Sequence, residues 1–195
     1  MGLLLRIYGD PVLRTRAREF AQGEIDAGFH ALVEDMAETM YEASGIGLAA
    51  NQIGELRRFF LADWAQAGDA PRKNGKRVKD PAKRELHVFI NPTILDSSPE
   101  DGDYNEGCLS IPELEADVFR PLRIRVAYRT LEWEERTEWL EGLAARVFQH
   151  ELDHLDGILF IDRLPESQRQ RMAGALNRIK KQSESPAETA TAGPR

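Results

Sequence analysis

The stretch QHELDHLDG, at residues 149–157, constrains the fold of this chain more than any other part of the sequence. His150 and His154 are four residues apart, so on a helix both imidazoles reach one face and can bind one metal ion. Glu151 follows the first histidine and can act on a water molecule at that ion. A helix with two ordinarily hydrogen-bonded histidines and a surface glutamate fits the same pattern. The motif alone leaves both interpretations open.

The neighbouring residues indicate where this helix lies. Leu143 and Val147 precede the two histidines at helical spacing, so the histidines fall on an apolar face. Gly157 is placed to end the helix, which we expect over residues 142–156. Polar groups on an apolar face need a partner, and a metal ion would supply one. The sequence therefore favours a buried, metal-binding helix.

Two histidines do not complete a catalytic metal site, which usually has three protein ligands. One protease type with this motif continues with a glycine and then a third histidine; Gly157 matches, but Phe160 stands where that histidine is needed. Another type adds a glutamate about 20 or more residues downstream. Glu184 and Glu188 lie in a tail predicted to be disordered, and Glu166 comes too early. Both protease completions are weak, which favours a third ligand upstream of the motif.

Cys108, the single cysteine of the chain, lies in the stretch EGCLS at residues 106–110. One cysteine excludes an intramolecular disulfide and suits a reducing compartment. A lone cysteine is most often a small buried hydrophobic residue. Beside an incomplete two-histidine site, however, its thiol is a candidate third ligand.

Hydrophobic periodicity predicts helices and strands without regular alternation, so the expected fold class is α+β, with antiparallel sheets packed around a central metal-binding helix. Gly45 would end the first helix and Pro92 would close the second strand. The expected elements are helices over residues 25–43, 142–156 and 165–181, strands over residues 58–62, 86–91 and 158–161, and a hairpin over residues 123–140.

Composition indicates an ordinary globular chain of one domain. Of 195 residues, 42% are hydrophobic and 30% are charged, and we expect a single catalytic domain over residues 1–182. Within it, residues 65–85 form a basic surface insert, and residues 183–195 a disordered tail. A net charge of −7 argues against a nucleic-acid binder that works through its overall field, but it leaves a locally basic patch open. No apolar run is long enough to span a membrane, and the opening has too short an apolar segment for a signal peptide, so we expect a cytoplasmic location.

Three motifs in order identify a family. GIGLAANQ at residues 45–52, EGCLS at 106–110 and QHELDH at 149–154 resemble the pattern of the peptide deformylases, and GDPVLR near the start agrees as well. The resemblance extends over about residues 5–180. It implies a peptide deformylase-like fold and hydrolysis of the N-formyl group from the N-terminal formyl-methionine of nascent polypeptides, with release of formate.

The resemblance also implies roles for residues. Cys108, His150 and His154 would bind the metal ion, with water in the open fourth position and Glu151 as general base and acid. Gln52 and the backbone N–H of Leu109 would form the oxyanion hole. Substrate contacts are implied for Gly45, Ile46 and Gly47, which would pair with the peptide, and for Ile46, Gly107, Leu109, Val147 and His150, which would surround the methionine side chain.

For the cofactor, the resemblance implies one divalent metal ion, Fe²⁺ in the cell, and a set of one thiolate and two imidazoles also suits Zn²⁺, Ni²⁺ or Co²⁺. The implied partners are N-formyl-Met nascent peptides and the ribosome, contacted through the basic helix at residues 165–181, with no membrane and no DNA. An ordinary solvated helix is the alternative for those residues.

This chain departs from the family pattern at three places: the insert at residues 65–85, Glu115 where some members have a substrate-contacting arginine, and Arg146 beside the pocket. These leave the preferred second and third substrate residues open. Two other functions also stay open: an endoprotease that uses the same histidines, and a structural-metal domain that only binds formylated peptides or the ribosome. Such a structural site would have four protein ligands and no need for Glu151 or Gln52.

Overall fold

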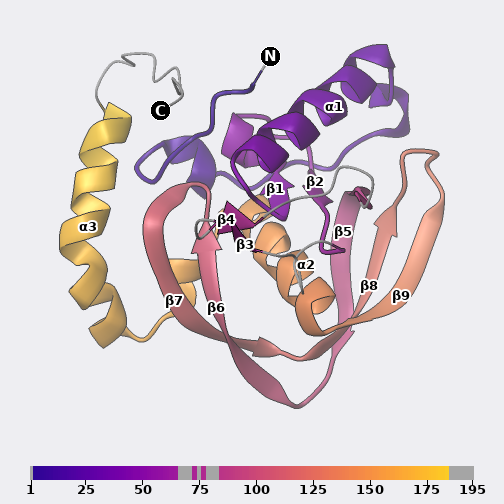
Figure 1. The fold of residues 1–195 in the computed structure, drawn as a ribbon. Helices are drawn as coiled ribbons and strands as arrows, with labels where there is room; N and C mark the ends of the chain where they lie inside the picture. Colours follow the sequence, from indigo (N-terminus) through magenta and orange to yellow (C-terminus); the bar gives the residue numbers. More distant parts are fainter. Residues whose placement is uncertain (1, 66–71, 74–75, 78–83, 185–195) are drawn as a thin grey trace.

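A computed structural model describes residues 2–65, 72–73, 76–77 and 84–184 of the chain. One helix, α2 (Gly142–Leu155), lies in the middle of the molecule, with β-strands on both sides of it (Figure 1). α1 (Ala27–Glu42) lies across one end, and α3 (Glu166–Glu184) stands at the outer edge beside the strand β7. The predicted α+β class with a central helix is confirmed.

Two antiparallel sheets surround α2. The larger has the strand order β1-β2-β5-β8-β9, and the smaller is the long hairpin β6-β7. The predicted hairpin over residues 123–140 is confirmed as β8 and β9, which pair from Arg123 with Glu141 to Arg129 with Glu135. The strands are β1 (Gly47–Ala49), β2 (Phe59–Ala62), β5 (His87–Ser97), β6 (Asp101–Cys108), β7 (Ile111–Pro121), β8 (Arg123–Arg129) and β9 (Glu135–Glu141).

The main hydrophobic core lies between α2 and the five-stranded sheet. Phe148 of α2 packs edge-on against Phe60 of β2 and Phe89 of β5, with ring centroids 5.2 Å away in both cases. From residue 145 to residue 155 every residue of α2 except His150 is buried. The sequence predicted burial of one face only. The helix is instead covered nearly all round, because β6-β7 lies over the side that the larger sheet leaves free.

Helix α1 confirms the prediction for residues 25–43, but Gly45 does not end it in the expected way. The left-handed residue is Ser44, with φ 61°, and its N–H donates to the carbonyl of Tyr41. The N–H of Gly45 donates to the carbonyl of Met40 at 2.8 Å. This pair of bonds is the Schellman termination, with Gly45 one position later than predicted.

Two of the predicted strands are wrong in detail. β5 does not end before Pro92 but continues to Ser97. The pairing of β5 with β8 shifts between Ile90 and Thr93, and this irregularity accommodates a proline that cannot donate to the ladder. Residues 158–161 do not form a strand, because the carboxylate of Asp162 accepts the N–H of Leu159 at 2.8 Å and closes a 3₁₀ turn, η5 (Phe160–Arg163).

Helix α3 confirms the helix predicted from residue 165 and runs three residues beyond 181. It packs through Leu176 and Ile179 into a second hydrophobic cluster with Leu13 and Phe160. Shorter 3₁₀ turns complete the chain: η1 (Pro11–Arg14), η2 (Gln22–Glu24) and η3 (Ala50–Ile53).

The predicted basic insert at residues 65–85 lies largely outside the described residues. Within it, the two-residue strands β3 (Arg72–Lys73) and β4 (Lys76–Arg77) pair antiparallel, which a simple loop would not do. Residues 185–195 of the predicted disordered tail are also not described. The domain limits of residues 1–182 and the disorder of the tail stay predictions.

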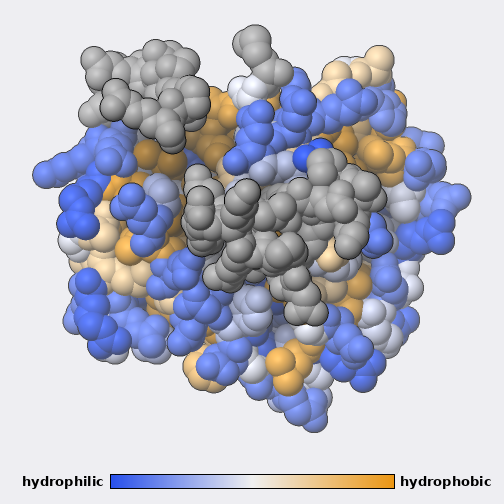
Figure 2. Space-filling view, in the orientation of Figure 1, coloured by the Kyte–Doolittle hydropathy of each residue, from blue (hydrophilic) through white to orange (hydrophobic). Residues whose placement is uncertain are grey.

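Hydrophilic residues cover most of the molecular face seen in Figure 2, with small hydrophobic patches between them. Among the described residues, the most exposed large hydrophobic side chains are Phe119, at 69%, and Leu4, at 65%. Over the described ranges of the chain, no helix has the length and apolar character needed to cross a membrane.

Candidate active site

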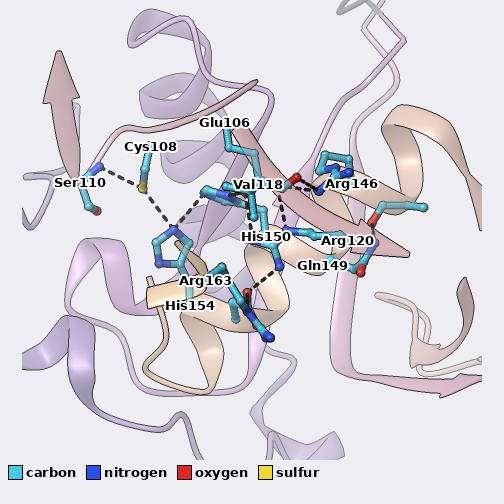
Figure 3. Close-up of polar contacts among 12 residues, drawn as sticks. Glu106, Cys108, Ser110, Val118, Arg120, Arg146, Gln149, His150, His154 and Arg163 are labelled. Atoms are coloured by element: carbon cyan, nitrogen blue, oxygen red, sulfur yellow. Dashed lines mark hydrogen bonds and ion pairs between the residues drawn. The ribbon is translucent and has the colours of Figure 1, made fainter. Parts of the chain in front are cut away.

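Three side chains from two distant stretches of sequence converge on one point (Figure 3). The Sγ atom of Cys108 lies 3.2 Å from Nε2 of His154, which lies 3.2 Å from Nε2 of His150. All three ligand atoms are within 4.8 Å of one another. The fold therefore brings together the three residues that the sequence predicted as metal ligands.

A helix and a strand end position these ligands. The histidines occupy successive turns of α2, and Cys108 is the last residue of β6. The pairing of β6 with β7 is regular from Asp101 to Gly107 and then shifts, so that Cys108 pairs with Ile111. The irregularity thus comes directly before the sulfur ligand, where the strand end meets the helix.

Glu106 fixes the orientation of His150. Its carboxylate lies 2.9 Å from Nδ1 of His150, which leaves Nε2 directed at the other ligand atoms. The same carboxylate accepts two hydrogen bonds from Arg120, at 2.8 and 3.0 Å, and one from Arg146 at 3.1 Å. Burial raises the pKa of Glu106, but its hydrogen bonds to His150 and Arg120 outweigh burial and lower the pKa to about 2. Glu106 is therefore a permanently charged anchor for the imidazole.

The surroundings of the two histidines suit a cation bound between them. Burial lowers the pKa of His150, but hydrogen bonds to Cys108 and Glu106 outweigh it and raise the pKa well above the ordinary value. Burial and the neighbouring His150 lower the pKa of His154, which keeps that imidazole neutral. The anionic groups around His150 thus favour a positive charge there, and the neutral imidazole of His154 is free to act as a ligand. A divalent ion held by one thiolate and two imidazoles agrees with both features. The residues present therefore fit a metal ion.

Glu151 lies beside this cluster with half of its carboxylate unused. The residue is 4% exposed, and its Oε2 has no hydrogen-bond partner among the residues that the structure describes. Its side chain passes over the Cα of Gly47, where a Cβ would come within 2.7 Å of the carboxylate carbon. Burial raises the pKa of Glu151 to about 7, although the charge of His150 opposes the rise. A buried carboxyl with such a pKa can both accept and donate a proton near neutral pH.

Gln52 directs an amide N–H toward the ligands. Its Oε1 accepts the backbone N–H of Ala49 at 2.8 Å, which fixes the orientation of the amide. Its Nε2 donates to Oγ of Ser110 at 3.1 Å and lies 3.5 Å from Sγ of Cys108. The residue is buried at the edge of the cleft described next, where its amide can also meet a bound carbonyl oxygen.

An open cleft of about 810 Å³ leads to the cluster. Gln52, Cys108, His150 and Glu151 lie in its wall, whereas His154 lies behind them. The predicted substrate-binding residues also line it: Gly45, Ile46, Gly47, Gly107, Leu109 and Val147.

Several charged residues near the ligands, most of them buried, were not predicted from the sequence as functional residues. Arg120 joins Glu106 to Asp153, with 2.6 Å between its Nη1 and Oδ2 of Asp153, and Arg163 binds the same aspartate. Arg146, noted only as a neighbour of the pocket, is 6% exposed and donates to Glu106. A signal for the two carboxylates was present in the sequence, because Glu106 lies inside EGCLS and Asp153 lies inside HELDH.

A helix that presents two histidines and an unpaired carboxylate to a thiol at the wall of an open cleft is typical of metal-dependent hydrolases. The family model described as polypeptide deformylase matches residues 3–170 of this chain. The chain therefore belongs to the peptide deformylase family, whose members are metal-dependent hydrolases that remove the formyl group from the N-terminus of nascent polypeptides.

Individual relatives agree with this assignment. A peptide deformylase from Thermus thermophilus is 47% identical over 169 residues, which cover 85% of this chain and 84% of the relative. One from Christiangramia forsetii is 41% identical over 188 residues, which cover 93% of this chain and 91% of the relative. A crystal structure of peptide deformylase from Thermus thermophilus superposes with a TM-score of 0.79 at 42% identity, covering 93% of this chain and 99% of that one.

Proposed function

We propose that this chain catalyses deformylation with a metal ion bound by Cys108, His150 and His154. The observation that supports the proposal most directly is the convergence of these ligand atoms within 4.8 Å beside the unpaired, buried Oε2 of Glu151. The chemistry that the ion supplies when bound is polarisation of a carbonyl group and a lowered pKa for a water molecule.

Glu151 transfers the proton in this proposal. It takes a proton from the water that attacks the formyl carbon and gives it to the amine nitrogen as the C–N bond breaks. The products are formate and a peptide with a free N-terminal methionine. The carboxylate needs no rearrangement for this, because its Oε2 makes no competing hydrogen bond within the described residues.

Gln52 and the backbone N–H of Leu109 hold the carbonyl oxygen as it gains negative charge. Each donor of this kind contributes about 3–4 kcal/mol to the stabilisation of a transition state. The amide of Gln52 is suited to the role, because the bond from Ala49 to its oxygen leaves the nitrogen directed toward Cys108.

The substrate lies along the edge of β1. Among the described strands, β1 ends the five-stranded sheet, so its free edge can pair with an extended peptide. Gly45, Ile46 and Gly47 would make these contacts. The methionine side chain would lie against Ile46, Gly107, Leu109, Val147 and His150, all of which line the cleft.

Substitution of Glu151 by glutamine tests the mechanism. Glu151→Gln should retain the metal ion and lose deformylation of formyl-Met peptides by about 10²–10⁴-fold, because the side chain can no longer take up the proton. Glu34→Gln, an exposed change on α1, is the matched control and should keep full activity. Metal analysis and an assay of formate release would measure both proteins. Retained activity in Glu151→Gln would refute the assignment.

The same assays separate this proposal from the endoprotease alternative. An endoprotease would cleave internal peptide bonds, and its metal ion would stay bound in Cys108→Ala. The deformylase proposal expects the opposite on both counts, since Cys108 is one of only three proposed ligands.

The proposed ion is Fe²⁺ in the cell, and Zn²⁺, Ni²⁺ or Co²⁺ can occupy the same ligands in purified protein. The support is chemical, because a thiolate with two imidazoles suits all four ions. Metal analysis of protein purified without oxygen, paired with the formate assay, would identify it. We also propose a cytoplasmic location, since nascent formylated peptides are made there.

Helix α3 supports a proposed contact with the ribosome. Its two acidic residues are Glu166 and Glu184, and its five basic residues are all exposed: Arg169, Arg171, Arg178, Lys180 and Lys181. A helix face of this charge can bind the phosphates of ribosomal RNA although the whole chain is acidic. The helix is held to the body by Leu176 and Ile179, which leaves its basic side chains directed outward.

A further inference from the structure

Two carboxylates in the wall of the cleft have no counter-charge among the residues that the structure describes. Glu113 and Glu115, both on β7, line the cleft and are exposed. Within the described part of the chain, neither makes an ion pair or a side-chain hydrogen bond. Elsewhere in the molecule, some exposed carboxylates, such as that of Glu135, pair with an arginine. The two glutamates in the cleft are therefore available to a bound molecule.

The fold places both glutamates close to the reaction centre. Glu115 is paired with Gly107, which precedes the proposed ligand Cys108. Its side chain extends over that glycine, where a Cβ would lie 3.2 Å from Cγ of Glu115. Glu113 stands in the irregular stretch between the pairs of Gly107 with Glu115 and of Cys108 with Ile111. Its φ of 66° is in the left-handed region, which is rare for a residue with a side chain.

The cations near the cleft do not neutralise this wall. Arg146 is the one arginine or lysine among the described residues that line it. Its guanidinium is already bound to Glu106, to the carbonyl of Val118 at 3.0 Å and to the carbonyl of Gly102 at 2.7 Å. These three contacts occupy the guanidinium within the protein, and Figure 3 shows the one with Glu106. The described residues that line the open part of the cleft therefore carry a net negative charge.

We propose that Glu113 and Glu115 make this enzyme prefer substrates with lysine or arginine at the first or second position after the formyl-methionine. An extended peptide advances about 3.3 Å per residue. Paired strand residues such as Gly107 and Glu115 lie about 5 Å apart. A long basic side chain one or two residues beyond the reacting group can therefore reach these carboxylates. The inference rests on the proposed function of the site and adds a substrate preference to it.

The preference is measurable as a ratio of kcat/KM values. Two series of peptides, formyl-Met-X-Ala and formyl-Met-Ala-X with X as lysine, alanine or glutamate, would be assayed for formate release. An exposed ion pair contributes up to about 1 kcal/mol, or roughly fivefold. We expect kcat/KM for the lysine peptide to exceed that for the glutamate peptide by about tenfold in at least one series. This ratio should fall toward one in 0.5 M salt.

The double variant Glu113→Gln with Glu115→Gln should bring the lysine-to-glutamate ratio to about one. The control Glu34→Gln, which changes the net charge by one unit at a distant exposed site, should leave the ratio unchanged. The ratio cancels any general loss of activity or of folded protein in the double variant. A lysine-to-glutamate ratio near one in the unmodified enzyme, or an unchanged ratio in the double variant, would overturn the proposal. Failure of the proposed function is distinct, since the unmodified enzyme would then release no formate from the alanine peptides.

Discussion

At the scale of single residues, the position of the Glu151 carboxylate depends on the absence of a side chain at residue 47. A Cβ there would come within 2.7 Å of the carboxylate carbon. Gly47→Ala should therefore displace Glu151 and reduce kcat/KM about 100-fold, the typical effect of a misplacement of about 1 Å. The metal content should not change, because the three atoms nearest to the added Cβ all belong to Glu151 and none to a proposed ligand. Formate release and metal analysis would measure both effects.

The control is Gly174→Ala on α3, where the added Cβ would have no atom of the described residues within 4 Å, apart from its chain neighbours and the nearby backbone of the helix itself. It should leave activity intact, and activity of Gly47→Ala equal to that of the control would contradict the argument.

The sequence could predict Cys108, His150 and His154, because spacing and residue type define metal ligands. It could not predict why residue 47 is glycine, since that depends on a contact between residues about a hundred positions apart in the chain.

At the scale of the element, α2 is bracketed by two glycines with positive φ, and these differ in their surroundings. At Gly142, with φ 57°, an added Cβ would have no atom of the described residues within 4 Å apart from its own local backbone. At Gly157, with φ 76°, it would lie 2.6 Å from the carbonyl oxygen of Arg14. Gly142→Ala should destabilise the fold by about 1–2 kcal/mol, the cost of a left-handed residue with a Cβ. Gly157→Ala should cost at least about 1 kcal/mol more. Urea unfolding of both variants would measure the difference, and equal free energies of unfolding would contradict it.

The difference between local patterns and tertiary contacts explains which elements the sequence could predict. The helices were predictable because their apolar residues recur with helical spacing and their ends carry glycine or proline. The strand β6 (DGDYNEGC) was not, because Asp, Gly and Asn are rare in strands. It forms because β7 pairs with it along almost its whole length and its buried Glu106 is bound by Arg120 and Arg146. Such support comes from tertiary contacts, which local patterns do not contain.

At the scale of the whole molecule, α3 is both part of the structure and a proposed binding surface. Leu176 and Ile179 are each 7% exposed and pack with Leu13 and Leu159 in the second hydrophobic cluster. Removal of the helix would expose that cluster and reduce stability as well as binding. A deletion therefore cannot separate the two roles, whereas substitutions on the exposed face can.

Charge reversal at Arg169, Arg171 and Arg178 should weaken ribosome binding without unfolding the protein, because all three side chains are exposed and none makes an ion pair within the described residues. Loss of three phosphate contacts should lower the slope of log affinity against log salt by about 2. Co-sedimentation with ribosomes over a salt series would measure it. The control is the same reversal of three exposed arginines on β8 and β9, Arg123, Arg125 and Arg136; the ion pairs of Arg123 with Glu141 and of Arg136 with Glu134 are exposed, and their loss should cost at most about 1 kcal/mol each. If both triple variants bound with the same salt dependence, the basic face of α3 would not be the contact, and only the net charge of the chain would matter.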